Sequence, residues 1–255
     1  MKRFFLLPLL TLCVVPLHAE SAIEGLSPQM ILIQARSMFP QENIEITGTL
    51  ETAEARGQNE VVRPYTLTLD WTDGNPEATC TVFDEKLETA VQCAHLVRRQ
   101  GQTTLALTAS DGTVTENVRL NTPVGDSDLT WVDLTFNYLW WKEVKQLSED
   151  ECAARNLKTR QGGRNCVILE ATSPDNISGL NTVLLWIDIS TGYLVQTEQT
   201  DQHGKPVRRM WVQRIGREEG RWVPREFRIQ RTGMRRVTKL VISTIHSASF
   251  SVEEN

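Results

Sequence analysis

The chain has 255 residues, of which 40% are hydrophobic and 23% are charged, and its formal net charge at pH 7 is −5. This mildly acidic composition lacks the basic character of proteins that bind nucleic acid, so no nucleic-acid partner is expected. A chain of this length can form one large β domain or two small ones.

The first 19 residues have the pattern of a cleaved secretory signal peptide. Lys2 and Arg3 precede an apolar run from Phe4 to Leu17, and the segment ends at the small residue Ala19. The run is shorter than the roughly 20 residues that span a bilayer. The alternative, an uncleaved anchor, is less favoured because no stop-transfer charges follow. We therefore expect an exported protein whose mature part, residues 20–255, is one soluble domain with a net charge of −7 after two positive charges are lost.

A helix is predicted at the start of the mature chain, over Ser27 to Phe39. Ser27 is a suitable N-cap, and Pro28 suits the first helical turn. Apolar residues follow at helical spacing, and Pro40 ends the helix.

Most of the remaining chain alternates between apolar and polar residues, which is typical of β-strands. The predicted strands are 44–50, 65–71, 79–83, 89–93, 103–108, 113–120, 183–189, 193–201, 207–215, 222–230 and 236–245. Asp111-Gly112 indicates a hairpin between two of them. A long antiparallel row must curl to bury its apolar face. The sequence therefore predicts a mainly β, single-domain fold with a few helices (α+β), in which a curled sheet forms an unclosed barrel capped by helices.

One segment in the middle breaks the strand pattern. From Gly125 to Trp141, capping residues are followed by apolar residues at helical spacing, which predicts a helix or a pair of helical turns. Its aromatic residues exceed what one core-facing stripe requires. We therefore predict that Asp128 to Trp141 lies across the mouth of the sheet and lines an apolar cavity. The expected lipid-binding residues are Trp131, Phe136 and Trp140, with Trp186 and Trp211 on the sheet as weaker candidates. Simple core packing is the alternative for each tryptophan.

Four cysteines remain in the mature chain, and an exported protein meets an oxidising compartment. Four cysteines allow three pairings. Local strand patterns favour disulfides between Cys80 and Cys93 and between Cys152 and Cys166, each stabilising the fold by about 3 kcal/mol. No Cys-x-x-Cys motif is present and the histidines lack ligand spacing, so neither a metal nor a cofactor is expected.

Positive charge is concentrated near the C-terminus. The segment from Lys205 to Lys239 contains twelve Lys or Arg residues and three acids. Two interpretations stay open: an interaction surface for an acidic partner or anionic lipid, or the solvated face of antiparallel strands.

The catalytic motifs of several enzyme classes are missing from the sequence. It contains no Gly-x-Ser-x-Gly, no His-Glu-x-x-His and no phosphate-binding glycine loop. The acid pairs fall in predicted turns or caps. We therefore expect a protein that is not an enzyme.

Two stretches carry a family resemblance. Residues 126–134 (Asp-Ser-Asp-Leu-Thr-Trp-Val-Asp-Leu) and 163–170 (Gly-Arg-Asn-Cys-Val-Ile-Leu-Glu), together with the element order, resemble the outer-membrane lipoprotein-sorting (LolA/LolB-like) superfamily, and in particular a poorly characterised bacterial branch. The resemblance implies an unclosed barrel with a helical lid over an apolar cavity, in the bacterial periplasm. It also implies a monomeric carrier of lipoproteins or related lipids, which holds acyl chains and exchanges them with a membrane-bound donor or receptor. A regulatory sensor of envelope stress that binds misplaced lipoprotein or lipopolysaccharide is the alternative, and an envelope enzyme ranks third.

Overall fold

The computed structural model describes residues 21–39, 43–53, 60–71, 76–86, 89–99, 102–173, 180–218 and 221–247. The predicted signal peptide, residues 1–19, lies outside this part of the chain. Among the described residues, no helix combines the length and the apolar character needed to cross a membrane.

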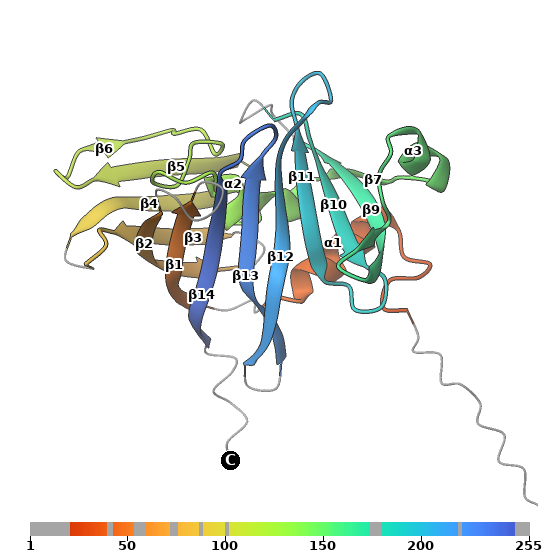
Figure 1. The fold of residues 1–255 in the computed structure, drawn as a ribbon, viewed down its shortest axis with the longest axis horizontal. Coiled ribbons are helices and arrows are strands. Elements are labelled where there is room, and N and C mark those ends of the chain that lie inside the picture. The colour runs from red at the N-terminus through yellow and green to blue at the C-terminus, as the bar shows by residue number, and fades with distance from the viewer. Residues whose placement is uncertain are drawn as a thin grey trace, which may run out of the picture.

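In the described residues, a single antiparallel sheet of fourteen strands forms the body of the protein (Figure 1). Its first strands are β1 (Ile44–Ala53), β2 (Val61–Asp70), β3 (Glu77–Phe83), β4 (Ala90–Arg99), β5 (Gln102–Ala109) and β6 (Val114–Thr115). The later strands are β7 (Glu143–Gln146), β8 (Arg160–Gln161), β9 (Arg164–Thr172), β10 (Thr182–Asp188), β11 (Leu194–Thr200), β12 (Pro206–Glu218), β13 (Arg221–Arg231) and β14 (Val237–Ser247).

The strand order is β6-β5-β4-β3-β2-β1-β14-β13-β12-β11-β10-β9-β7, and β8 pairs with β9. Chain neighbours therefore pair with each other almost throughout, while β1 joins β14 and brings the two halves of the chain together. Within the described residues β6 and β7 end the row without pairing to each other, so the sheet curls but does not close. The predicted mainly β, single-domain fold with an unclosed barrel is confirmed.

The predicted N-terminal helix is present as α1 (Pro28–Ser37). The Ser27 hydroxyl accepts a hydrogen bond from the backbone N–H of Met30 at 3.4 Å and so caps the first turn. Ile31, Leu32 and Ala35 are buried, which fixes one face of α1 against the core.

The middle of the chain forms two short helical turns, α2 (Trp131–Leu134) and the 3₁₀-helix η3 (Asn137–Trp140). Phe136 separates them with a left-handed backbone conformation, φ +47°. Every residue from 127 to 141 is buried, and we call this stretch the interior segment. The prediction of paired helical turns is confirmed. Its predicted place across an opening is wrong, because the segment fills the space that the curled sheet encloses.

Aromatic contacts hold the interior segment to the surrounding elements. The Trp140 ring meets Trp71 of the loop after β2 edge-on, with ring centroids 4.6 Å apart. The Phe136 ring packs against Phe39, just after α1, and against Phe227 of β13. The ring centroids are 5.0 Å and 5.7 Å apart, respectively. The segment therefore joins both halves of the sheet in one hydrophobic core.

A second, smaller hydrophobic cluster contains Trp186 of β10 and the helix α3 (Glu149–Ala154). Figure 1 places α3 at the margin of the sheet, beside β7 and β9. The Trp186 indole N–H donates to the carbonyl oxygen of Lys158 at 2.8 Å. Trp186 therefore belongs to this cluster and not to the main core.

All four described cysteines are free thiols in the structure. Cys80 lies opposite Ala94 and Cys93 lies opposite Thr81 in the β3–β4 pairing. Side chains alternate between the two faces of a strand, so Cys80 and Cys93 point to opposite faces. The predicted Cys80–Cys93 disulfide is therefore wrong for this register. Cys152 and Cys166 share the smaller cluster, and a bridge between them stays a prediction.

Peptide mapping after alkylation in denaturant tests these assignments on protein purified without a reducing agent. We expect Cys80 and Cys93 to be alkylated without prior reduction. In the native protein Cys80 should react slowly, because burial raises the pKa of its thiol and only the thiolate attacks the reagent. A Cys80–Cys93 crosslinked peptide would contradict the observed register. A Cys152–Cys166 crosslinked peptide would confirm the remaining bridge.

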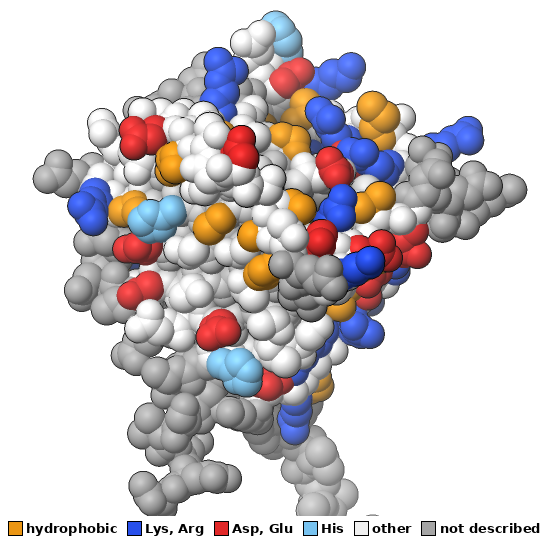
Figure 2. Space-filling model, turned by 90° about the vertical axis from the view of Figure 1, so that its left-hand side faces the viewer, with side chains coloured by type: hydrophobic (Ala, Val, Ile, Leu, Met, Phe, Trp, Pro, Cys, Tyr) orange, Lys and Arg blue, Asp and Glu red, His pale blue; other side chains and the backbone are white. Residues whose placement is uncertain are grey.

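The outer surface over β2–β6 carries isolated apolar side chains. Figure 2 shows this side of the molecule, where hydrophobic side chains stand singly between polar ones and lysines and arginines gather toward one edge. Single exposed apolar residues are normal on a protein surface. The described part of this face therefore presents no extended apolar patch.

Candidate functional site

A cleft of about 800 Å³ opens where β11 and β12 diverge. These strands pair only up to Gln196 and Trp211, beyond which β12 continues to Glu218 with β13 as its partner (Figure 1). The lining residues come from the β8–β9 hairpin, the β10–β11 turn and strands β11, β12 and β13. They are Gln161, Gly162, Arg164, Thr191, Tyr193, Leu194, Val195, Gln196, Trp211, Val212, Gln213, Ile215, Trp222, Val223 and Pro224.

The walls of the cleft are mainly apolar, and several of its side chains face solvent. Trp222 is 49% exposed and Ile215 is 42% exposed, although both are large hydrophobic residues. Trp211 is half-buried, and its indole N–H donates to Oε1 of Gln213 at 3.2 Å. Exposed apolar groups that converge on one concavity are typical of a ligand site.

Tyr193 connects the two walls of the cleft. Its hydroxyl donates a hydrogen bond to the carbonyl oxygen of Trp222 at 3.0 Å. This bond ties the β10–β11 turn to the start of β13, across the widening gap between β11 and β12. The bond therefore links the two walls of the cleft.

Among the described residues that line the cleft, Arg164 is the one that carries a charge. Nη1 of Arg164 lies 2.6 Å from Oδ2 of Asp188. Burial disfavours the charged form of Asp188, but hydrogen bonds from Arg164, Ser190 and Thr191 outweigh burial and lower the pKa of this carboxyl. The pair is therefore ionised and internally neutral. On the opposite wall, the Arg217 guanidinium lies 4.9 Å from the centre of the Trp222 ring.

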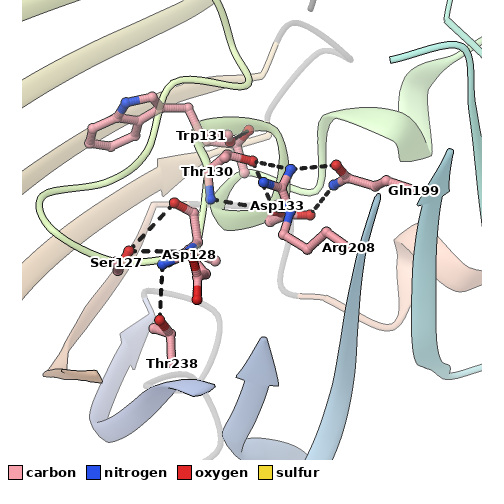
Figure 3. Close-up of polar contacts among 10 residues, drawn as sticks. Ser127, Asp128, Thr130, Trp131, Asp133, Gln199, Arg208 and Thr238 are labelled. Carbon is pink, nitrogen blue, oxygen red and sulfur yellow. Dashed lines mark hydrogen bonds and ion pairs between the residues drawn. The ribbon is translucent and has the colours of Figure 1, made fainter. Parts of the chain in front are cut away.

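A buried polar network fixes the interior segment to the sheet (Figure 3). Nε of Arg208 lies 3.1 Å from Oδ2 of Asp133, as an ion pair without hydrogen-bond geometry. Nη2 of Arg208 donates to the Thr130 hydroxyl at 2.9 Å and also to Gln199, which in turn donates to Asp133. Asp133 and Arg208 are both buried, so each charge depends on the other.

A second ion pair anchors the start of the interior segment to the β13–β14 connection. Arg236 contacts both oxygens of Asp128, through Nη2 at 2.7 Å and Nε at 3.1 Å. The backbone N–H of Asp128 donates to the hydroxyl of Thr238 on β14 at 2.9 Å (Figure 3). Together the two ion pairs hold residues 128–133 against β11, β12 and β14.

Five arginines of the arginine-rich segment form ion pairs with acids. Arg208 and Arg236 pair with the interior segment, while three further arginines pair with glutamates of the sheet: Arg209 with Glu198, Arg225 with Glu218 and Arg228 with Glu226. For these five arginines the ion pairs favour a structural role over a free basic surface.

The predicted site residues separate into three places. Trp211 lines the cleft. Trp131, Phe136 and Trp140 belong to the main core and Trp186 to the smaller cluster, and none of these four lines the cleft. The structure thus brings one of the five predicted residues, Trp211, to this cleft.

The sequence analysis missed Trp222, Ile215 and Tyr193 as site residues. For Trp222 a signal was available, because strand alternation puts it on the same face as Glu226 and Arg228. A tryptophan on the polar face of a strand is unusual and marks a possible contact site. No comparable signal distinguishes Tyr193, which acts through a contact distant in sequence.

Comparison with known proteins agrees with this architecture. A family model described as an uncharacterized protein matches residues 117–251, which is more than half of the chain. No curated protein matches the chain.

Several solved structures share the fold. A DUF1329 family protein from Desulfovibrio piger has a TM-score of 0.71 at 12% identity, covering 89% of this chain and 93% of that chain. A putative outer membrane lipoprotein-sorting protein domain from Vibrio parahaemolyticus has a TM-score of 0.71 at 14% identity, covering 89% and 94%. A LolA superfamily protein from Nitrosomonas europaea has a TM-score of 0.70 at 16% identity, covering 88% and 94%. At such low identity these likenesses establish the fold alone. The chain thus belongs to the family of uncharacterized proteins whose model it matches, and it has the LolA-like fold of outer-membrane lipoprotein-sorting proteins.

Proposed function

We propose that this protein is a periplasmic carrier or binder of lipoproteins or related lipids, which holds an acyl chain in the cleft between β11 and β12 without chemical change. The observation that carries the proposal is the apolar cleft itself. Its volume of about 800 Å³ falls within the range of roughly 300–1,000 Å³ typical of ligand pockets. The LolA-like fold and the lipoprotein-sorting description of one structural neighbour support the same ligand class.

Binding of an acyl chain in the cleft is driven by burial of apolar surface. Each methylene removed from water contributes about 0.8 kcal/mol. In the free protein Trp211, Ile215 and Trp222 leave part of their apolar surface in water, so the chain also covers protein surface. The interior segment keeps its structural role in this proposal, because none of its residues lines the cleft, while Leu194 and Val223 join the cleft to the main core.

Replacing Trp211 with alanine is expected to weaken binding of a palmitoylated peptide about tenfold, as for central aromatic contacts in interfaces. Titration of the peptide into the purified protein measures this change. Met234→Ala is the matched control, because Met234 is also an exposed hydrophobic residue but does not line the cleft. Equal affinities for the wild type and Trp211→Ala would contradict the proposed site.

Mass spectrometry of organic extracts tests whether the protein carries lipid in the cell. Protein recovered from the periplasm should retain an acylated molecule, and Trp211→Ala should retain less of it per folded molecule. Protein free of lipid that also fails to bind the palmitoylated peptide would contradict the carrier function. A stable membrane partner in place of lipid would favour the sensor alternative.

A further inference from the structure

No acid is found among the described residues that line the cleft, although the chain as a whole is acidic. The sequence has 32 acids and 27 lysines and arginines, yet none of the fifteen lining residues is an acid. The polar lining groups are one arginine and neutral side chains, including Gln161, Gln196 and Gln213. This lining therefore suits a ligand that brings its own negative charge.

The acids nearest the cleft along these strands are already paired. Asp188 forms an ion pair with Arg164, and Glu218 forms one with Arg225. Oε1 of Glu226 lies 2.9 Å from Nε of Arg228. Each of these carboxylates is matched by one arginine. Among the described residues, these three carboxylates are therefore each offset by a positive charge.

Arg217 places a positive charge beside the cleft, next to the lining residue Trp222. It is exposed, lies opposite Trp222 in the β12–β13 pairing and stacks over the ring of that cleft residue. Within the described part of the chain no carboxylate pairs with Arg217. Its planar guanidinium carries five N–H donors that match phosphate or carboxylate oxygens. Because stacking holds it in place, less side-chain freedom is lost on binding.

We propose that the occupant of the cleft is an anionic amphiphile, with its apolar chain against Trp211 and Ile215 and its phosphate or carboxylate headgroup on Arg217. This inference rests on the proposed function, because it names the headgroup of the molecule whose chain the cleft holds. It goes further in assigning a headgroup preference to one residue. Exposed ion pairs contribute little individually, so the preference is modest in size.

Three dodecyl amphiphiles below their micelle concentrations serve as probes: dodecyl phosphate, dodecyl maltoside and dodecyltrimethylammonium. We expect dodecyl phosphate to bind the wild type roughly threefold to fivefold more tightly than dodecyl maltoside, and the cation to bind most weakly. Arg217→Gln should bind dodecyl phosphate and dodecyl maltoside equally. Arg209→Gln, which changes an arginine paired with Glu198 on the same strand, should keep the wild-type preference. Raising the salt to 0.5 M should reduce the preference by screening.

The outcomes separate the two proposals. Equal binding of all three probes by the wild type, or an unchanged preference in Arg217→Gln, would overturn the headgroup assignment while the cleft remains a lipid site. Failure of Trp211→Ala to weaken any probe would overturn the cleft itself. If inorganic phosphate at the same concentration as dodecyl phosphate displaced it from the wild type, the site would be one for free anions, and this result would also overturn the proposal.

Discussion

Replacing Arg208 with alanine is expected to lower the free energy of unfolding by about 3–5 kcal/mol, the range for breaking a buried ion pair. The buried Asp133 carboxylate would lose its cation, and Gln199 and Thr130 would lose a donor. A buried group left without its partner bears the desolvation cost alone. Denaturant unfolding monitored by tryptophan fluorescence measures the change.

The adjacent arginine provides the control for this prediction. Arg209 lies on the same strand, but its side chain is 56% exposed and Nε is 3.5 Å from Oε2 of Glu198. Arg209→Ala should therefore cost about 1 kcal/mol or less. Similar losses for the two variants would show that the network of Figure 3 does not anchor the interior segment.

Local periodicity was sufficient to predict most strands and the N-terminal helix. The alternation in 183–189 corresponds to β10, and Asp111-Gly112 does mark a turn between β5 and β6. The predicted strand 113–120 shrinks to Val114–Thr115, because the chain leaves the sheet there to enter the interior. The helix α3 was missed, although Ser148 and Glu151 form a capping box that was available in the sequence.

Long-range pairing could not be predicted from local patterns. The β1–β14 ladder joins Ile44 to Ser247, about two hundred residues apart in the sequence, and this pairing lets the sheet curl around the interior segment. The aromatic surplus of that segment was interpreted as two-sided contact with a ligand and core. It arises because sheet and helices surround the segment, so the whole stretch packs against protein.

The cleft was unpredictable for a related reason. It exists because β12 is thirteen residues long while β11 has seven, and because irregular pairing between Val212 and Ile215 bends β12 away from β11. Strand lengths and bulges depend on partners that a sequence does not identify. Trp211 was placed among the candidates from its residue type, whereas the divergence of the two strands makes it a cleft residue.

Comparing the Trp140→Ala and Trp222→Ala variants distinguishes a residue of the hydrophobic core from a residue of the ligand site. Trp140 is 8% exposed, and its ring meets Trp71 edge-on. Cζ of Arg36 lies 5.3 Å from the centre of the Trp140 ring. Its truncation opens a core cavity and should lower the free energy of unfolding by about 3–5 kcal/mol. Trp222 is half exposed, so its truncation should change stability by only about 0.5 kcal/mol while weakening binding of the palmitoylated peptide. Both quantities are measured on each variant, with binding expressed per folded molecule. If Trp140→Ala instead weakens binding at nearly unchanged stability, the interior segment is the ligand site and the cleft between β11 and β12 is not.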